Sequence, residues 1–168
     1  MRLMMDRLPS PIGLNFIVWE VEEQVRALDF EEYESRMLAL LQKHYRHFEL
    51  SRADAPRHLS DKINAYFKGD LRAIGTIAVK TGGTPFQQDA WLALRAIPPG
   101  APASYGEQAA RIGRPKAVRA VGAANGANPV PLILPCHRVI GSTGKLTGYG
   151  GGLARKQWLL THEKRFAG

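Results

Sequence analysis

The sequence predicts an α/β protein of the α+β type: a small N-terminal domain of sheet and helices, packed on a mainly helical C-terminal domain that carries a helix-turn-helix. Two apolar runs at residues 12–20 and 25–30, separated by a short turn, are typical of a β-hairpin. Apolar residues recur at helical spacing through most of the remaining chain. The turn-rich run at residues 80–85 separates the two parts, so we expect domains at 1–81 and 82–168.

In the N-terminal part, residues 21–24 are expected to form the hairpin turn. A helix is predicted over 31–46, because apolar residues recur there at helical spacing and acids occupy its first turn. A second helix is predicted over 59–67, with Ser60 as its N-terminal cap and Gly69 as its stop.

The C-terminal part is predicted to be a series of helices. The first covers 86–97 and ends at a Pro-Pro-Gly run. Ser104 and Glu107 have the spacing of a capping box, and the helix they open should end near Gly113. Pro115 is suited to the first turn of the next helix, so the two short helices resemble a helix-turn-helix. The remaining predicted elements are an extended segment or turn at 128–131, a strand at 132–135, a glycine-rich loop at 141–152 and a helix at 153–164.

The net charge of +8 is concentrated in one part of the 168-residue chain. Residues 108–162 contain no Asp or Glu, and the rest of the chain contains as many acids as bases. The basic residues of this window are Arg111, Arg114, Lys116, Arg119, Arg138, Lys145, Arg155 and Lys156. A one-sided basic field indicates a polyanionic partner such as nucleic acid. A generic basic surface or anionic lipid would also fit, but these residues alternate with Gly, Pro and Ala and do not line a bulky amphipathic helix.

Cys136 is the only cysteine, so it can form neither an intrachain disulfide nor a thiolate metal cage. His137 and Arg138 follow it directly, and cationic or basic neighbours lower the pKa of a thiol. A buried core cysteine is the alternative. Cys136 and His137 are a candidate thiol and base, and Glu163 is a candidate group to orient the base. Adjacent residues on a strand point to opposite faces, so direct contact between Cys136 and His137 is not assured, although a bridging water could connect them. One cysteine, no apolar N-terminal stretch and no membrane-length apolar run predict a cytoplasmic protein.

The motifs converge on one family. Arg119, the run Asn128-Pro-Val-Pro and the run Pro-Cys136-His-Arg-Val resemble the active-site region of the 6-O-alkylguanine-DNA alkyltransferases, also called methylated-DNA–protein-cysteine methyltransferases. Thr84-Pro-Phe-Gln, Tyr105-Gly-Glu, Gly148-Tyr149 and Trp158-Leu-Leu-Thr-His-Glu match the same family in the same order. The resemblance is specific over residues 82–164 and weaker before them.

The resemblance implies a DNA-repair protein that transfers an alkyl group from the 6-oxygen of guanine to its own cysteine and is consumed. The 4-oxygen of alkylated thymine is a second candidate source of the alkyl group. Cys136 would be the acceptor, and His137 the base that acts through water. Glu163 would orient His137, Tyr105 would donate to the leaving guanine, and Asn128 would support the active-site turn. The thioether product has no carbonyl for water to attack, so one chain should repair one lesion.

The resemblance also implies that the helix-turn-helix enters the minor groove and that Arg119 fills the space of a flipped-out nucleotide. The expected DNA-binding residues are Arg119, Lys116, Arg114, Arg138, Ala120 and Ala123. The expected pocket residues are Pro131, Val139, Tyr149 and Gly150. Gly150 stands where relatives commonly carry Ser or Ala, which suggests a roomier pocket. The expected partner is double-stranded DNA with alkylated guanine, and no metal, cofactor or membrane is expected for this monomer.

Two other functions remain open at this point. A lesion-binding or helix-turn-helix protein could mark alkylated guanine without repairing it, although such a protein has no need of a thiol at position 136. A cysteine hydrolase could use the Cys-His-Glu set, but that leaves the basic window unexplained.

Overall fold

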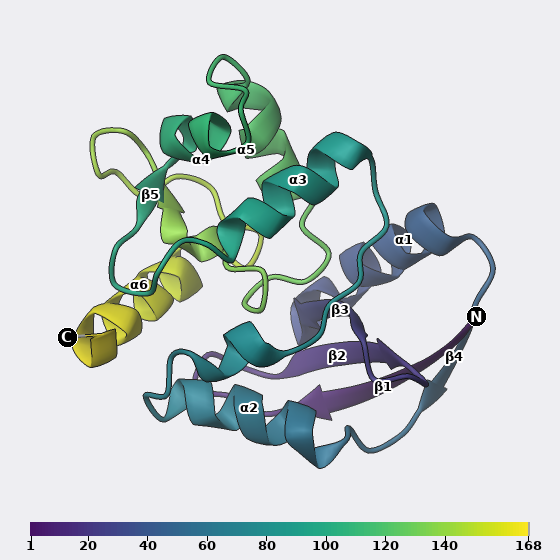
Figure 1. The fold of residues 1–168 in the computed structure, drawn as a ribbon. Coiled ribbons are helices and arrows are strands. Elements are labelled where there is room, and N and C mark those ends of the chain that lie inside the picture. Colours follow the sequence, from purple (N-terminus) through teal and green to yellow (C-terminus); the bar gives the residue numbers. More distant parts are fainter. Residues whose placement is uncertain (168) are drawn as a thin grey trace. The chain divides into compact units, whose positions relative to one another are not determined.

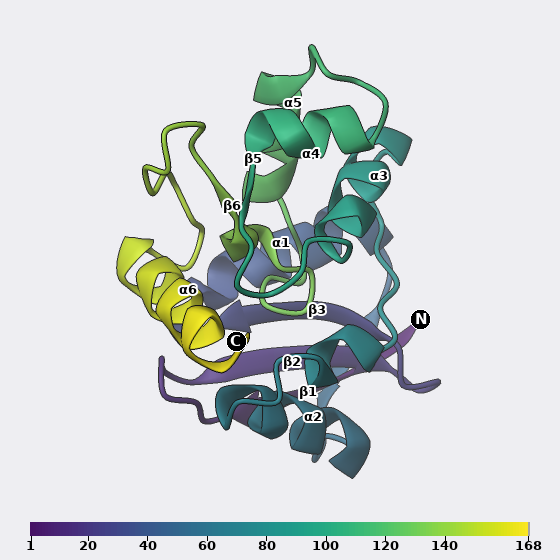
Figure 2. The ribbon, with the colours of Figure 1, turned by 60° about the vertical axis from the view of Figure 1, so that its left-hand side comes forward.

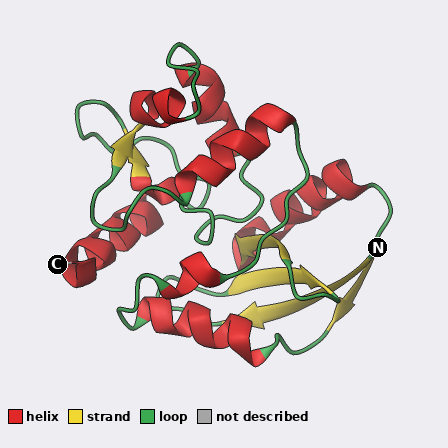
Figure 3. Ribbon diagram, in the orientation of Figure 1, coloured by secondary structure: helices red, strands yellow, loops and turns green. Residues whose placement is uncertain are grey.

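The computed structural model describes residues 1–167 and confirms the predicted α+β class. The chain forms two compact units, one from Met1 to Gly82 and the other from Gly83 onward. The first unit holds the four-stranded sheet, whereas the second is mainly helical (Figures 1 and 3).

The sheet of the first unit has the strand order β3-β2-β1-β4. The predicted hairpin is confirmed: β2 (Asn15–Glu20) and β3 (Val25–Phe30) pair antiparallel. The sequence reading missed β1 (Arg2–Leu8), which pairs antiparallel with β2, and β4 (Glu49–Arg52), which pairs parallel with β1. Strand β4 is short and mostly exposed, so it has little of the apolar alternation that identifies a strand.

One face of the sheet is covered by α1 (Glu34–Tyr45), which follows the 3₁₀ helix η1 (Glu31–Tyr33). Met37 and Leu41 of α1 are buried in the same core as residues of β1, β2 and β3. Helix α2 (Arg57–Phe67) lies on the other side of the sheet from α1 (Figures 1 and 2).

The predicted cap of α2 is wrong. The helix begins two residues earlier than expected, with Pro56 at its N-cap position. Ser60 is therefore inside the helix, where its hydroxyl donates to the carbonyl of Arg57. The stop is as expected, because Gly69 has a φ of 114° just after the last turn. The 3₁₀ helix η2 (Ala73–Thr76) follows and contacts α2.

Capping boxes begin two helices of the second unit. Helix α3 (Pro85–Leu94) is capped by Thr84, whose side chain accepts from the backbone of Gln87 while Gln87 bonds back. Helix α4 (Tyr105–Arg111) is capped in the same way by Ser104 and Glu107, which confirms that prediction.

Helix α5 (Val118–Gly126) begins three residues later than predicted from Pro115. Residues 114–117 instead form a turn closed by a bond from the Ala117 amide to the Arg114 carbonyl. Helices α4 and α5 pack on each other, as a helix-turn-helix requires (Figure 1).

Buried hydrogen bonds fix the position of α5. The amides of Gln108 and Asn125 bond to each other at 2.9 and 2.7 Å. The Trp91 indole donates to the carbonyl of Ala124 at 2.7 Å. These bonds hold α5 against α4 and α3.

The predicted strand at 132–135 is absent. A turn occupies these positions, and Leu132 is held in the left-handed region with a φ of 78°. Proline cannot donate to a sheet, so Pro131 and Pro135 disfavour a strand here. The 3₁₀ helix η3 (Cys136–Arg138) comes next, and β6 (Val139–Ile140) then pairs parallel with β5 (Ala103–Ser104). A loop leads to α6 (Leu153–Ala167).

Candidate active site

Cys136 is the first residue of η3, and its thiol lines a cavity of about 480 Å³. The residue is 8% exposed. The cavity is lined by Tyr105, Gly122, Asn125, Gly126, Cys136, Thr147, Gly148, Tyr149 and Gly150. A volume of this size suits a small ligand or a nucleobase. A buried thiol at the wall of such a cavity is placed for chemistry on a bound group, which an ordinary core cysteine is not.

The 3₁₀ turn gives Cys136, His137 and Arg138 three different directions. A 3₁₀ helix has three residues per turn, so successive side chains are about 120° apart. Cys136 therefore reaches the cavity, while His137 and Arg138 both contact Glu163 of α6. This differs from the strand geometry expected from the sequence, in which neighbours alternate between two faces.

The turn before Cys136 is held by Asn128, which is buried. Its Nδ2 donates to the carbonyl of Leu134 at 2.8 Å, and its Oδ1 accepts from the amide of Val130 at 2.9 Å. The Leu134 carbonyl also accepts from the Cys136 amide at 2.8 Å. One side chain thus bridges the turn that contains the left-handed Leu132 and ends at the thiol.

Replacing Asn128 with alanine is expected to lower the free energy of unfolding by about 2 kcal/mol or more, because a buried N–H and a buried C=O lose their side-chain partner. Urea unfolding measures the change. Asn64 is exposed on α2, so Asn64→Ala is the matched control and should change stability by no more than about 0.5 kcal/mol. Equal stability of the Asn128→Ala variant and the wild type would refute the bridging role.

Glu163 is the centre of a buried network. Its Oε2 lies 2.7 Å from Nε2 of His137. Arg138 donates to both carboxylate oxygens, from Nε at 2.9 Å and from Nη2 at 3.0 Å, and its Nη1 donates to the carbonyl of Ile97 at 2.9 Å. His137 and Glu163 are fully buried. Paired, fully hydrogen-bonded charges of this kind are what a protein interior tolerates.

The network fixes the protonation state of its members. Burial alone would raise the pKa of Glu163, but the charge that His137 carries when it is protonated, the charge of Arg138 and the hydrogen bonds of both residues lower it to about 2. Burial lowers the pKa of His137 below its usual value and outweighs the opposing effect of Glu163. Since Arg138 already compensates the carboxylate charge, we assign His137 as neutral.

A neutral His137 must donate from Nε2 to the carboxylate, which leaves the lone pair on Nδ1. That Nδ1 atom is buried, and no hydrogen-bond partner is found for it among residues 1–167. Nδ1 of His137 is thus a buried hydrogen-bond acceptor in the residue that follows Cys136. It could accept a proton, as a base does.

The position of Arg138 does not suit the DNA-binding role expected of it. The guanidinium is 6% exposed and its donors are engaged with Glu163 and Ile97. It therefore supports the active site from within and is not available to a phosphate. The sequence showed only a cation in a basic window, while the partner Glu163 lies far along the chain.

Two residues near the cavity were missed as site residues. Thr147 lies in the loop before α6, and its Oγ1 is 2.9 Å from the hydroxyl of Tyr105. Lys156 was counted only as part of the basic window, but it is fully buried and its Nζ donates to the carbonyl of Thr147 at 3.0 Å. Burial lowers the pKa of Lys156, and Cys136 acts in the opposite direction. Helical spacing could have found it, because Lys156, Leu159 and Glu163 share the buried face of α6.

The predicted pocket residues divide into two groups. Tyr149 and Gly150 line the cavity. Pro131 and Val139 are buried and are not among the lining residues within the described part of the chain. Val139 is used in β6, and Pro131 is used in a bridge to Leu134 inside the turn.

The other expected DNA-binding residues lie on the surface. Arg119, Ala120 and Ala123 are exposed on α5, and Arg114 and Lys116 are exposed in the turn before it. The alanines leave a smooth helix surface beside long cationic side chains. This arrangement suits close approach to a nucleic-acid groove.

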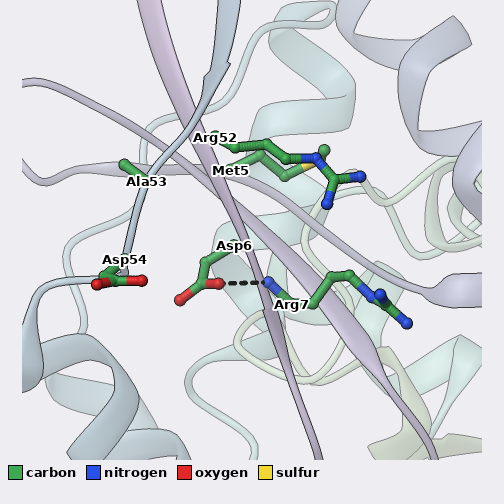
Figure 4. A pocket seen from close by; sticks show the side chains of 6 residues that line it. All are labelled: Met5, Asp6, Arg7, Arg52, Ala53 and Asp54. Atoms are coloured by element: carbon green, nitrogen blue, oxygen red, sulfur yellow. Dashed lines mark hydrogen bonds between the residues drawn. The ribbon is translucent and has the colours of Figure 1, made fainter.

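A second pocket lies in the first unit and has a volume of about 250 Å³ (Figure 4). It is lined by Met5, Asp6, Arg7, Arg52, Ala53 and Asp54. Both carboxylate oxygens of Asp6 are engaged, because they accept from the amides of Arg7 and Ala55. Within residues 1–167, no group of three or more His, Cys, Asp or Glu side chains could hold a metal ion. The residues that line this pocket include no Cys, Ser, Thr, Lys or His, so it offers no nucleophile comparable to Cys136.

None of the helices in the described part of the chain combines the length and the apolar character needed to cross a bilayer.

The chain matches known families over nearly its whole length. Residues 85–165 match the model described as 6-O-methylguanine DNA methyltransferase, DNA binding domain. Residues 5–81 match the model described as 6-O-methylguanine DNA methyltransferase, ribonuclease-like domain. A methylated-DNA–protein-cysteine methyltransferase from Salmonella typhimurium is 52% identical over 165 residues, which cover 97% of this chain and 96% of the relative. One from Mycobacterium tuberculosis is 57% identical over 104 residues, which cover 62% of each chain.

Solved structures give the same result. The crystal structure of Mycobacterium tuberculosis O6-methylguanine methyltransferase superposes with a TM-score of 0.83 at 40% identity, covering 99% of this chain and 95% of that one. The Mycobacterium tuberculosis OGT in complex with DNA superposes with a TM-score of 0.77 at 39% identity, covering 98% of this chain and 94% of that one.

Proposed function

The chain belongs to the 6-O-methylguanine DNA methyltransferase family, and from this premise we infer that it repairs DNA by transferring an alkyl group from the 6-oxygen of guanine to Cys136. The observation that carries the assignment is the thiol at the wall of a nucleobase-sized cavity, next to a histidine bonded to an ionised buried glutamate. Double-stranded DNA with alkylated guanine is the partner.

The proposed reaction begins with the thiol. Nδ1 of His137 takes the proton of Cys136 through a bridging water, and Glu163 stabilises the imidazolium that results. The thiolate attacks the alkyl carbon in line, so the S–C bond forms as the C–O bond breaks and its electron pair leaves with guanine. The hydroxyl of Tyr105 donates to the departing base and offsets its charge. Asn128 keeps the turn in place.

The product is a thioether, which water does not hydrolyse. Each chain therefore accepts one alkyl group. With alkylated duplex in excess, repaired guanine should reach a plateau at one equivalent per chain. Continued release of repaired DNA beyond one equivalent would refute self-consumption and favour a hydrolase, and tight binding without any repair would favour a lesion-binding protein.

DNA recognition is proposed to use α5 and the turn before it. Arg119, Lys116 and Arg114 supply positive charge, and Ala120 and Ala123 allow close approach. The alkylated atom is buried in a stacked duplex, so the nucleotide must leave the stack at a cost of a few kcal/mol. We propose that Arg119 enters the space it leaves.

Replacing Arg119 with alanine is expected to slow repair of duplex DNA about 10- to 100-fold, because the flipped state loses a stabilising contact of about 1 to 3 kcal/mol. Reaction with free 6-O-alkylguanine base needs no flipping and should keep its rate. Single-turnover assays on both substrates measure the difference. Arg111 is also exposed, so Arg111→Ala is the charge-matched control. Equal loss on duplex and free base in the Arg119 variant would refute the role.

Pocket residues Tyr149 and Gly150 would contact the base, and the absence of a side chain at Gly150 supports tolerance of larger alkyl groups. The 4-oxygen of alkylated thymine is proposed as a second substrate position. The two compact units support domains at 1–81 and 82–168. The single cysteine suits a reducing cytoplasm, and we propose a monomer that needs no cofactor.

A further inference from the structure

Thr147 is tied to the site at two of its atoms. Its hydroxyl oxygen lies 2.9 Å from the hydroxyl of Tyr105 at the start of α4. Its main-chain carbonyl accepts from Nζ of Lys156 at 3.0 Å. Because Lys156 is fully buried on α6, the second bond anchors the loop to a fixed point. Thr147 thus links the loop, α6 and α4, and it lines the cavity together with Tyr105.

The loop around Thr147 needs such an anchor. Residues 141–152 contain Gly141, Gly144, Gly148 and the run 150–152, and glycine loses more conformational freedom on ordering than any other residue. Beyond their chain neighbours, neither Gly148 nor Gly144 has an atom within 4 Å of the position a Cβ would take. Packing around these two glycines is therefore sparse, and the two hydrogen bonds of Thr147 help to hold the loop in position.

The bond between the two hydroxyls has a chemical consequence. A phenol can donate one hydrogen bond and still accept another. When the Tyr105 hydroxyl donates to a departing base, negative charge develops on the phenol oxygen. A hydroxyl that donates to that oxygen stabilises the charge, and linked hydrogen bonds strengthen one another in a dry site. The Thr147 hydroxyl is within hydrogen-bond distance for this task.

We propose that Thr147 is a positioning residue for the departure of guanine: its hydroxyl orients the hydroxyl of Tyr105 and donates to the phenol oxygen as the proton moves toward the base. The inference rests on the proposed function, in which Tyr105 assists the leaving group. In the full step, the S–C bond forms, the C–O bond breaks with its electron pair on guanine, and the Tyr105 proton neutralises that charge. The phenolate left on Tyr105 is balanced by the proton that His137 took from Cys136, which returns to it through water. Thr147 keeps its own proton throughout.

The test separates departure of guanine from reactivity of the thiol. In Thr147→Val the shape is kept and the hydroxyl is lost, so single-turnover transfer from alkylguanine DNA should slow about 10- to 100-fold, the effect of one hydrogen bond to a charged group. Alkylation of Cys136 by iodoacetamide releases iodide and no base, and its rate should not change. Thr147→Ser keeps the hydroxyl and should restore transfer to within about threefold of wild type.

Matched controls come from the same loop and the same pair. Thr143 is exposed on the loop and does not line the cavity, so Thr143→Val should leave both rates unchanged. In a Tyr105→Phe background, Thr147→Val should add no further loss, because its effect acts through the missing hydroxyl. Thr147→Ala provides a second hydroxyl-free variant if valine impairs folding.

Three results would overturn the inference: an unchanged transfer rate in Thr147→Val, an equal slowing with iodoacetamide, or a further loss in the Tyr105→Phe background. The second result would mean that Thr147 only holds the loop or the thiol in place. These outcomes are distinct from failure of the proposed function, in which the wild-type chain itself would transfer no alkyl group to Cys136.

Discussion

The variant Cys136→Ser is expected to accept no alkyl group from DNA. A hydroxyl is a far weaker acid than a thiol, so the His137 base that serves a thiol cannot generate an equivalent serine anion at neutral pH. No second cysteine exists in the chain to replace it. Transfer of labelled alkyl groups from duplex DNA to protein should fall to background, which is the largest effect on activity that we predict.

Binding provides the control for this loss. The serine differs from cysteine by one atom at the cavity wall, and the exposed cations of α5 and the preceding turn are untouched. We therefore expect the affinity for alkylated duplex to stay within about threefold of wild type at fixed salt. If the serine variant acquired nearly as much alkyl label as the wild type, the assignment of Cys136 would be contradicted. Equal loss of binding and transfer would instead indicate a folding defect.

The largest effect on stability is expected at Glu163. Replacing it with alanine leaves the buried guanidinium of Arg138 without its carboxylate and removes the partner of His137. Breaking one side of a buried ion pair costs about 3 to 5 kcal/mol. Urea unfolding of the Glu163→Ala variant should show a loss of this size, and transfer should fall about 100-fold or more because the base loses its orientation.

A double variant separates the two effects. Replacing both members of a buried pair with apolar residues is often close to neutral for stability. Glu163→Leu combined with Arg138→Met should therefore regain part of the stability that Glu163→Ala loses, while transfer stays low. Recovery of transfer in the double variant would show that the carboxylate is not needed to orient His137.

The pH dependence of stability follows from the same residue. The pKa of Glu163 is about 2 in the folded protein, whereas a fully solvated glutamate has a pKa of 4.5. A carboxyl whose folded pKa is depressed stabilises the fold above its unfolded pKa, and this contribution is lost as the pH falls from about 4.5 toward 2. Glu163→Gln should flatten this part of the curve of unfolding free energy against pH, and a curve of unchanged steepness would count against the ionised state.

Local patterns in the sequence identified those elements that short-range interactions determine. The capping box of Ser104 and Glu107 is formed within three residues, and the β2–β3 hairpin is formed by neighbouring segments. Strand β4 was missed because its pairing with β1 joins distant parts of the chain and its own residues are mostly exposed. Its formation depends on the partner strand more than on its own composition.

The active site shows the same division. Cys136, His137 and Glu163 were predicted as site residues from their residue types and the family motifs, and the structure brings Nε2 of His137 within 2.7 Å of Oε2 of Glu163. The backbone around Cys136 was read as a strand because its residues are apolar, but prolines and the Asn128 bridge favour a turn. The burial of Arg138 could not be read from a formal charge, because burial depends on a carboxylate that arrives from α6.

The central claim is that one sulfur atom takes the alkyl group and keeps it. Intact-mass analysis of the protein after incubation with excess 6-O-methylguanine duplex, followed by peptide mapping, tests it most directly. We predict a mass gain of one methyl group per chain, located on Cys136 and stable over time. Repaired DNA with no change in protein mass, or a methyl group on any other residue, would contradict the account.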